Sequence, residues 1–263
     1  MSALGGSIAS FYEEHGSLYD LISEDRDFEA QASFIAAELL RHRRPARYLE
    51  LFAGPACHAG ALARSHGTDC RAIDASAEMR RIAAMKGNVS EDRYHVAHLP
   101  GMPSAEALGG AFDGVSVPRY SIGYLTPLET GTLFQRISSL LVPGGRLMLE
   151  LHDLALVRSD FAALEIRDRV LPLGDGAALQ CIWPAGPLRW HADDWTVEMD
   201  VVLRRLAEGR VTAEHTFVSV ERIYARSEIE ALASLAGGFR PVAPSRPPAA
   251  FQGGEIVLLE KPV

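Results

Sequence analysis

Short apolar runs alternate with helix-like segments through the first part of the chain. The helix-like segments carry apolar residues at helical spacing and lie at residues 10–40, 56–65, 77–86 and 126–142. The apolar runs lie at residues 47–52, 70–74, 94–97, 112–117 and 146–151. Strands that alternate with helices favour parallel pairing through right-handed crossovers. The pattern therefore predicts an α/β fold with helices on both faces of a mostly parallel sheet.

Two of these helices have clear start signals. Ser76 is a good N-cap, and Thr126 is followed three residues later by Glu129, which is a capping-box pattern. Pro127 occupies the first helical position, where its missing N–H costs nothing. We predict helices that begin directly after Ser76 and Thr126.

After His152 the spacing of apolar residues changes to period two. Residues 195–204 and 211–224 alternate in this way, with Glu208, Gly209 and Arg210 between them, which predicts an antiparallel hairpin. A helix from Ser227 and two strands, at 239–242 and 255–260, end the chain. With the five earlier runs these strands make a seven-stranded sheet.

The change of pattern predicts the domain organisation. We expect a core of residues 1–155 and 221–263, which includes an N-terminal helical segment at 10–44. Residues 156–220 would be an inserted antiparallel β lid.

Charge and cysteine content narrow the function classes. Lys and Arg total 26 against 34 Asp and Glu, a net charge of −8, so a nucleic-acid partner is not expected. No apolar run approaches the roughly 20 residues of a membrane span, and no signal peptide is visible. Cys57, Cys70 and Cys181 form no CxxC pair, which argues against a disulfide framework and favours a reducing, cytoplasmic setting. The ligand atoms of residues 191–194 lack supporting spacing, so no metal is expected.

The most informative stretch is residues 48–56, which reads as strand, tight turn and helix start. A turn of small residues lets a ligand approach the backbone, and a helix N-terminus favours a carboxylate or phosphate. Asp74 ends the next strand, 24 residues after Glu50, where an acid can accept both hydroxyls of a ribose. The GxGxxG pattern is absent because Phe52 and Ala56 stand where its glycines would be. A dinucleotide is therefore disfavoured.

Here the sequence resembles a known family. YLELFAGPA resembles the first motif of class I S-adenosylmethionine (SAM)-dependent methyltransferases, and AIDASAEMRRIA resembles the second. FDGVSVPRYSIGYL and LVPGGRLMLEL resemble the segments of their fourth and fifth strands. The likeness is closest to antibiotic-sugar N-methyltransferases and includes YDLISEDRDFEAQASFIAAELL near the N-terminus. It covers residues 10–153 and, more weakly, 221–263, and it implies a Rossmann-like fold with SAM as cofactor.

The resemblance implies contacts with the methionine part of SAM. Ala53 and Gly54 would lie against it, and Glu50 would support this turn and the α-ammonium group. The Pro118 backbone would face the sulfonium end. Tyr19 could reach the carboxylate, or it could equally be a core aromatic.

The resemblance also implies contacts with the adenosine part. Asp74 would hold the ribose, and Ala75 and Met79 would flank the adenine. His98 and Leu99 would lie at the adenine edge. The family commonly has an acid at the position of His98, and a neutral His can accept the same hydrogen bond through one ring nitrogen.

Methyl transfer from a sulfonium is an in-line displacement that needs positioning and exclusion of water. A base is useful for a hydroxyl acceptor and optional for an amine that arrives neutral. His152, Asp153 and Tyr124 follow the predicted fourth and fifth strands, at the edge of the sheet where ligands bind. We expect His152 to be the base or to orient the acceptor. Tyr124 could equally form a wall of the site, and His152 and Asp153 could form a polar loop.

Three functions stay open on these grounds. The first is transfer of a methyl group to N or O of a small molecule, in natural-product biosynthesis, with residues 156–220 as the acceptor lid. The second is a methyltransferase fold that performs other chemistry, such as cyclisation or hydrolysis, and the third is a non-catalytic binding module. An apolar face on the inserted sheet would serve a homodimer or the core of a monomer.

Overall fold

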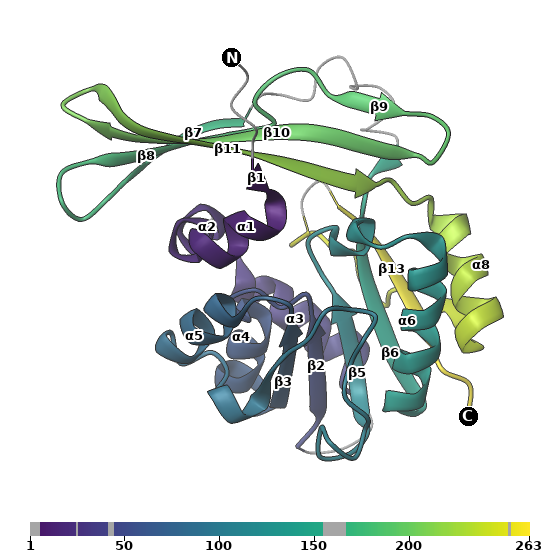
Figure 1. Ribbon diagram of the computed structural model, residues 1–263. Helices are drawn as coiled ribbons and strands as arrows, with labels where there is room; N and C mark the ends of the chain where they lie inside the picture. Colours follow the sequence, from purple (N-terminus) through teal and green to yellow (C-terminus); the bar gives the residue numbers. More distant parts are fainter. Residues whose placement is uncertain (1–5, 25, 42–44, 155–166, 252–253) are drawn as a thin grey trace. The chain divides into compact units, whose positions relative to one another are not determined.

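The computed structural model describes residues 6–24, 26–41, 45–154, 167–251 and 254–263 (Figure 1). The chain divides into two compact units. The first, here called the antiparallel unit, consists of residues 1–26 and 154–223. The second, called the parallel unit, consists of residues 27–153 and 224–263. The predicted lid begins in residues 156–166, which lie outside the described residues.

The parallel unit is an alternation of strands and helices. Its elements in chain order are α3 (Phe28–Leu39), β2 (Arg47–Leu51), α4 (Cys57–His66), β3 (Asp69–Asp74), α5 (Ala77–Met85), η1 (Glu91–Arg93), β4 (Tyr94–Val96), β5 (Phe112–Val117), η2 (Ser121–Tyr124), α6 (Pro127–Leu140), β6 (Leu141–His152), α8 (Arg226–Gly237), β12 (Arg240–Val242) and β13 (Gly254–Glu260). The start signals are confirmed: Ser76 caps α5 through its side chain, and Thr126 and Glu129 form a capping box at α6.

The described strands of this unit form one seven-stranded sheet in the order β12-β13-β6-β5-β2-β3-β4. β2 pairs in parallel with both β3 and β5, and β6 continues the parallel part beside β5. Only the strand at the end of the chain, β13, runs antiparallel to β6 and β12. The predicted mostly parallel seven-stranded sheet is confirmed.

Helices cover both faces of this sheet (Figure 1). α3 and α4 pack together, and α6 and α8 form a second pair. β2 and β5 are buried along almost their whole length, as expected of central parallel strands. α3 comes so close to β5 that a Cβ on Gly114 would lie 2.7 Å from Cβ of Leu39, so only glycine fits there.

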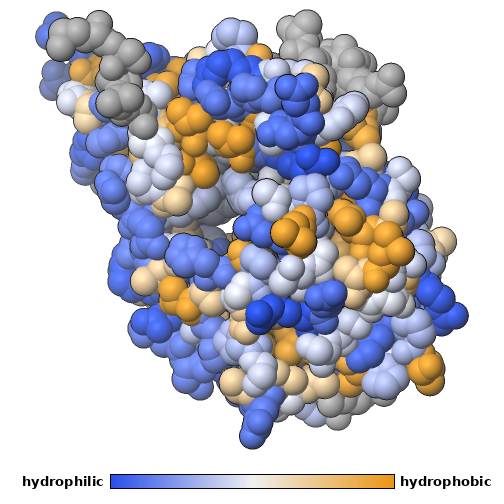
Figure 2. All heavy atoms as spheres, turned by 45° about the vertical axis from the view of Figure 1, so that its right-hand side comes forward, coloured by the Kyte–Doolittle hydropathy of each residue, from blue (hydrophilic) through white to orange (hydrophobic). Residues whose placement is uncertain are grey.

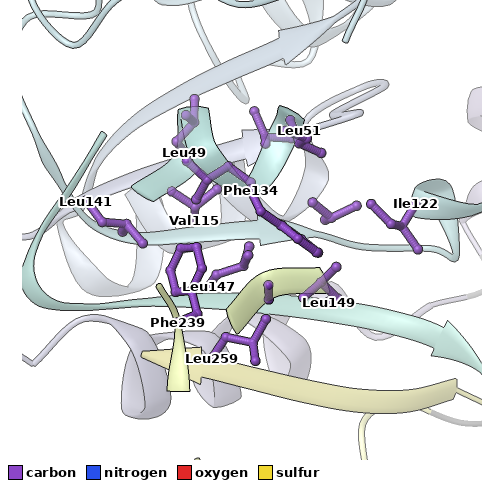
Figure 3. Packing of buried hydrophobic residues seen from close by; sticks show 14 of the residues in the cluster. Leu49, Leu51, Val115, Ile122, Phe134, Leu141, Leu147, Leu149, Phe239 and Leu259 are labelled. Atoms are coloured by element: carbon purple, nitrogen blue, oxygen red, sulfur yellow. The ribbon is translucent and has the colours of Figure 1, made fainter. Parts of the chain in front are cut away.

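The main core lies between the sheet and the pair α6 and α8. Phe134 of α6 and Phe239, which follows α8, meet edge to face with ring centroids 6.4 Å apart (Figure 3). Side chains of the central strands complete this core, among them Leu49, Val115 and Leu149. The rigid strands that position the site are therefore held by continuous apolar packing.

The antiparallel unit contains β1 (Gly6–Ser7), α1 (Ile8–Glu14), α2 (Gly16–Ser23), β7 (Arg167–Pro172), β8 (Ala178–Trp183), β9 (Arg189–His191), β10 (Thr196–Ala207) and β11 (Arg210–Arg222). β10 and β11 are the predicted hairpin. The strand order is β1-β11-β10-β8-β7, with β9 on β10. Phe11 of α1 and Ile22 of α2 pack against one face of this sheet, beside Phe217 and Val201.

Two expectations for the N-terminus differ from the structure. The predicted helix at residues 10–40 is divided into α1, α2 and α3, with breaks at His15 and after Ser23. The first 26 residues also group with the inserted sheet rather than with the core. The reason is that β1 pairs in parallel with β11 and that Phe11 is buried against Phe217.

The visible surface mixes hydrophilic and hydrophobic side chains (Figure 2). Within the described ranges, no helix combines the length and apolar character that crossing a bilayer requires.

Candidate functional site

The strand order of the parallel unit reverses between β2 and β5. The chain passes from β2 outward through β3 and β4, and then returns to begin β5 on the other side of β2. In open α/β sheets, ligands bind outside the carboxyl ends of the strands at such a switch point. The segments that follow β2, β3, β5 and β6 are therefore the candidate site.

The loop at residues 52–56, here called the β2–α4 loop, has an unusual backbone. Phe52, Gly54 and Ala56 have φ angles of 50°, 50° and 54°, all in the left-handed region. Ala56 is also the N-cap of α4 and brings no side-chain cap. The three left-handed residues stand where the first motif of the resembling family has its glycines, and glycine adopts this backbone region without a steric cost.

Side chains from three neighbouring segments form hydrogen bonds with the backbone of this loop. The amide of Gly54 donates to Oδ2 of Asp74 (2.9 Å), and its carbonyl accepts from the Tyr94 hydroxyl (2.7 Å). Asn88 donates through Nδ2 to the carbonyl of Pro55 (2.9 Å). Burial, together with the Asp74 carboxylate, raises the pKa of Tyr94 well above 10.0. Its hydroxyl therefore keeps the proton that it donates to the loop.

Asp74 ends β3 beside the loop. Besides Gly54, it accepts from the amide of Ser76 through Oδ1 (2.9 Å). The amide of Ala97 donates to the carbonyl of Asp74 (2.8 Å), which brings the segment after β4 to the same place. A carboxylate offers about four lone-pair positions, so these two amide bonds do not by themselves exhaust what Asp74 can accept.

Glu50, near the end of β2, is buried under the loop with 1% of its surface exposed. Its Oε1 lies 2.7 Å from Nδ1 of His58, and its Oε2 accepts from the amide of Ala59 (2.9 Å). Both oxygens thus contact the first turn of α4. Support of the loop by Glu50 agrees with this geometry, and contact with an α-ammonium group stays a prediction.

The ends of β5 and β6 form the other side of the site. Pro118 is followed by Arg119 and Tyr120, which are left-handed with φ angles of 56° and 61°. The amide of Arg119 donates to the fully buried Glu150 (2.6 Å). The Tyr120 ring is stacked on the ring of His152, with centroids 4.1 Å and planes 15° apart. His152 is therefore part of an aromatic pair at the carboxyl edge of the sheet, with Asp153 next to it in the chain.

Tyr124 lies in η2, the short helix after β5. Its ring centroid is 6.4 Å from that of Phe52, so η2 and the β2–α4 loop meet through these two rings. Phe52 packs at the edge of the main core. The prediction that Tyr124 follows β5 at the site is consistent with this contact, and its role as catalyst or wall stays open.

The residues predicted for the adenosine part follow β3 and β4 in the chain, and their contact with a ligand stays a prediction. Met79 of α5 is buried, while Leu99 is partly buried against the main core. His98 is exposed after β4, and Ala75 lies between β3 and the cap of α5. Ala53 is buried, and its amide donates to the carbonyl of Ile73 (3.1 Å).

Tyr19 belongs to the antiparallel unit. Its ring meets Phe11 and Tyr12 edge to face, with centroids 5.9 and 4.9 Å away. These contacts agree with the interpretation of Tyr19 as a core aromatic, and its contact with a ligand stays a prediction. In the described part of the chain, no group of three or more His, Cys, Asp or Glu side chains could hold a metal ion.

Several residues of this region were not singled out from the sequence. They are Gln31, His58, Asn88, Tyr94, Tyr120 and Glu150. Gln31 and His58 carry a usable signal, since polar side chains on the apolar faces of two helices must find partners when buried. Asn88 and Tyr94 carry none, because their partners are backbone carbonyls of a distant loop.

The residues present fit an adenosyl ligand. The loop keeps its left-handed bend, Asp74 is directed at the loop rather than away from it, and the Phe52 ring is packed toward Tyr124. Ala56 at the N-cap of α4 brings no side-chain cap, and the amide of Ala59 in the first turn donates to the Glu50 carboxylate.

No protein-family model matches the chain, and no curated protein matches it in sequence. Solved structures do match. DesVI from Streptomyces venezuelae is 22% identical with a TM-score of 0.71, over 95% of this chain and 98% of that one. The sugar N-methyltransferase KedS8 from Streptoalloteichus is 20% identical with a TM-score of 0.69, over 100% and 96%. The CcbJ methyltransferase from Streptomyces caelestis is 18% identical with a TM-score of 0.68, over 98% of each chain. The chain thus has the fold of these proteins, as the resemblance predicted.

Proposed function

We propose that the chain is an enzyme that transfers a methyl group from SAM to a nitrogen or oxygen of a small molecule. The observation that carries the proposal is the left-handed β2–α4 loop bonded to Asp74 at the switch point of the sheet. The names of similar structures, which include a sugar N-methyltransferase, support a small-molecule acceptor from natural-product biosynthesis. Acceptor choice is assigned to the inserted segment at residues 156–220.

SAM, when bound, supplies an electrophilic methyl carbon. The chain's own residues have to hold the ligand and take up a proton. We assign the ribose hydroxyls to Asp74, the methionine part to the backbone of Ala53 and Gly54, and the sulfonium end to Pro118. His152 accepts a proton from the acceptor through a ring nitrogen, while the stacked Tyr120 ring limits the orientations of the imidazole.

We place the protein in the cytoplasm, since Cys57, Cys70 and Cys181 form no disulfide with one another. Burial raises the pKa of Cys181 to about 11, so this thiol stays protonated and unreactive. A nucleic-acid partner is not part of the proposal because of the net charge of −8.

The first test concerns Asp74. Replacing Asp74 by Asn removes the charge and turns an NH₂ group toward one of two backbone amides that need an acceptor. We expect Asp74→Asn to weaken binding of S-adenosylhomocysteine at least ten-fold, or about 1.4 kcal/mol, measured by calorimetry. The matched control is Asp92→Asn, because Asp92 is exposed on η1. Equal affinity of both variants would remove Asp74 from the site.

The second test concerns His152. For a hydroxyl acceptor, loss of a general base lowers kcat by about 10²- to 10⁴-fold, and His152→Ala should do so without changing the affinity for S-adenosylhomocysteine. Methyl transfer is followed by a gain of one methyl in the acceptor's mass. Full turnover by His152→Ala would exclude this role.

Binding and activity measured together separate the proposal from its alternatives. Binding of S-adenosylhomocysteine without methylation of any amine or hydroxyl acceptor would favour a diverged enzyme or a binding module. Absence of binding to both SAM and S-adenosylhomocysteine would contradict the proposal itself.

A further inference from the structure

A buried polar chain runs beneath the β2–α4 loop. It links Glu50 of β2, His58 of α4, Gln31 of α3 and the carbonyl of Ala250. The first three side chains are each only 1% exposed. Such groups are costly to bury unless every donor and acceptor is satisfied, so the direction of each hydrogen bond can be worked out.

The directions of these hydrogen bonds follow from the contact with Ala250, at one end of the buried polar chain. The carbonyl of Ala250 can only accept, so Nε2 of Gln31 donates to it (2.9 Å). Oε1 of Gln31 therefore faces His58, and Nε2 of His58 must donate to it (2.8 Å). One ring proton of His58 is thus assigned to Nε2.

The other ring nitrogen faces an acid. Nδ1 of His58 lies 2.7 Å from Oε1 of Glu50, a length typical of a charge-assisted bond. One proton lies between these atoms, on the imidazole or on the carboxyl group. Glu50 also accepts from the amide of Ala59, in the first turn of α4, and this bond favours the ionised carboxylate. The proton is then on Nδ1.

We propose that His58 is an imidazolium held by Glu50 and acts as a positioning residue for the β2–α4 loop. Glu50 lies two residues before the loop and His58 two residues after it, so the pair joins the two ends of the loop. Gln31 links the Glu50–His58 pair to α3 through its hydrogen bond with His58. Phe28 of α3 also meets the imidazole edge to face, with ring centroids 5.0 Å apart. The part of the proposal that concerns ligand binding rests on the proposed function.

The Glu50–His58 pair should affect how tightly an adenosyl ligand binds. A loop with three left-handed residues keeps its shape only when its surroundings hold it there. His58→Gln removes the positive partner and leaves Glu50 as a buried carboxylate without it, which is destabilising for the loop. Affinity for an adenosyl ligand should then fall.

The first measurement needs no ligand. Nitrogen-15 NMR of the histidine rings in the full-length protein reports which ring nitrogens carry protons, and the signals of His58 are those lost in His58→Gln. We expect both ring nitrogens of His58 to carry a proton in the wild-type protein. A wild-type ring with one unprotonated nitrogen would overturn the proposal, whether or not His58→Gln folds, since the remaining histidines can be assigned by their own variants.

The second measurement tests the positioning role. The Kd of S-adenosylhomocysteine is measured by calorimetry at neutral pH for the wild type, His58→Gln and the control His95→Gln. His95 lies on β4 and is only partly buried. We expect at least a ten-fold weaker Kd for folded His58→Gln and less than a three-fold change for the control.

The two proposals fail in different ways. A folded His58→Gln with the wild-type Kd would overturn the positioning role. If the wild type binds no adenosyl ligand, the proposed function fails, and the NMR result still decides the state of His58.

Discussion

At the scale of single residues, the site depends on backbone conformations that side chains normally oppose. Phe52 and Ala56 are left-handed on either side of Gly54, and Arg119 and Tyr120 are left-handed after β5. Each such residue costs about 1–2 kcal/mol relative to glycine. Strain of this kind persists where the surroundings over-determine the backbone. Among the described residues, four of the six left-handed non-glycine residues lie in the two segments of the switch point, and the other two, Trp195 and Glu208, lie in the antiparallel unit.

Ala56 offers a direct measure of that strain. Ala56 and Ala61 are both fully buried in or beside α4, but only Ala56 is left-handed. Ala61→Gly should lower the free energy of unfolding by about 2 kcal/mol, from the lost methyl group and the cost of glycine inside a helix. In Ala56→Gly the relief of strain offsets the lost methyl, so we expect a change within about 1 kcal/mol of zero. Denaturant unfolding of both variants checks this, and equal losses would show that Ala56 is not strained.

At the scale of elements, α1 and α2 are joined at His15, which packs on β11. Its ring lies 4.5 Å from that of His215 and 5.6 Å from that of Phe217. Burial lowers the pKa of His15 below its ordinary value of 6.5, and the nearby His215 acts in the same direction against the smaller opposite effect of Glu14. The junction is therefore sensitive to acid.

The sign of this effect follows from proton linkage. Because the pKa of His15 is lower in the folded protein, the unfolded chain binds the proton first as the pH falls. The stability that the neutral ring provides is complete above pH 6.5 and is lost as the pH falls below 6.5 toward the lowered value. The melting temperature should drop between pH 7.5 and 5.5, and His15→Asn should show a smaller drop. An unchanged drop in His15→Asn would assign the acid sensitivity to other groups, and His66→Asn in α4 is the control.

Elements with local signals could be predicted from the sequence, and those set by distant partners could not. The capping box of Thr126 and Glu129 involves residues three positions apart and is visible in the sequence. The predicted start of α6 is therefore correct. The division of residues 10–40 into three helices was missed because helical periodicity does not reveal that His15 is held against His215. The same holds for the site. Gly54 and Asp74 could be identified from their motifs, whereas the bond from Tyr94 to Gly54 depends on tertiary packing.

At the scale of the whole molecule, the two units have separate cores, and the helices α1 and α2 pack in the core of the antiparallel unit. β1 is an edge strand that pairs with β11, the last strand of the inserted segment, and Phe11 of α1 is buried against the same sheet. No composition change marks this association in the sequence. It follows from the meeting of apolar faces that are far apart along the chain, and for that reason the predicted domain limits placed residues 10–26 with the parallel sheet.

Phe11 therefore tests the division into units. Its side chain is fully buried, and its ring lies 5.1 Å from that of Phe217. Phe11→Ala leaves a cavity that costs about 3–5 kcal/mol, and this loss should fall on the antiparallel unit. Measured by hydrogen exchange, amides of β10 and β11 should lose protection while those of β2 and β5 keep it. Phe112→Ala is the matched control, since Phe112 is fully buried in β5, and it should have the opposite pattern. Loss of protection in β2 and β5 on replacing Phe11 would mean that the N-terminal helices support the parallel sheet after all.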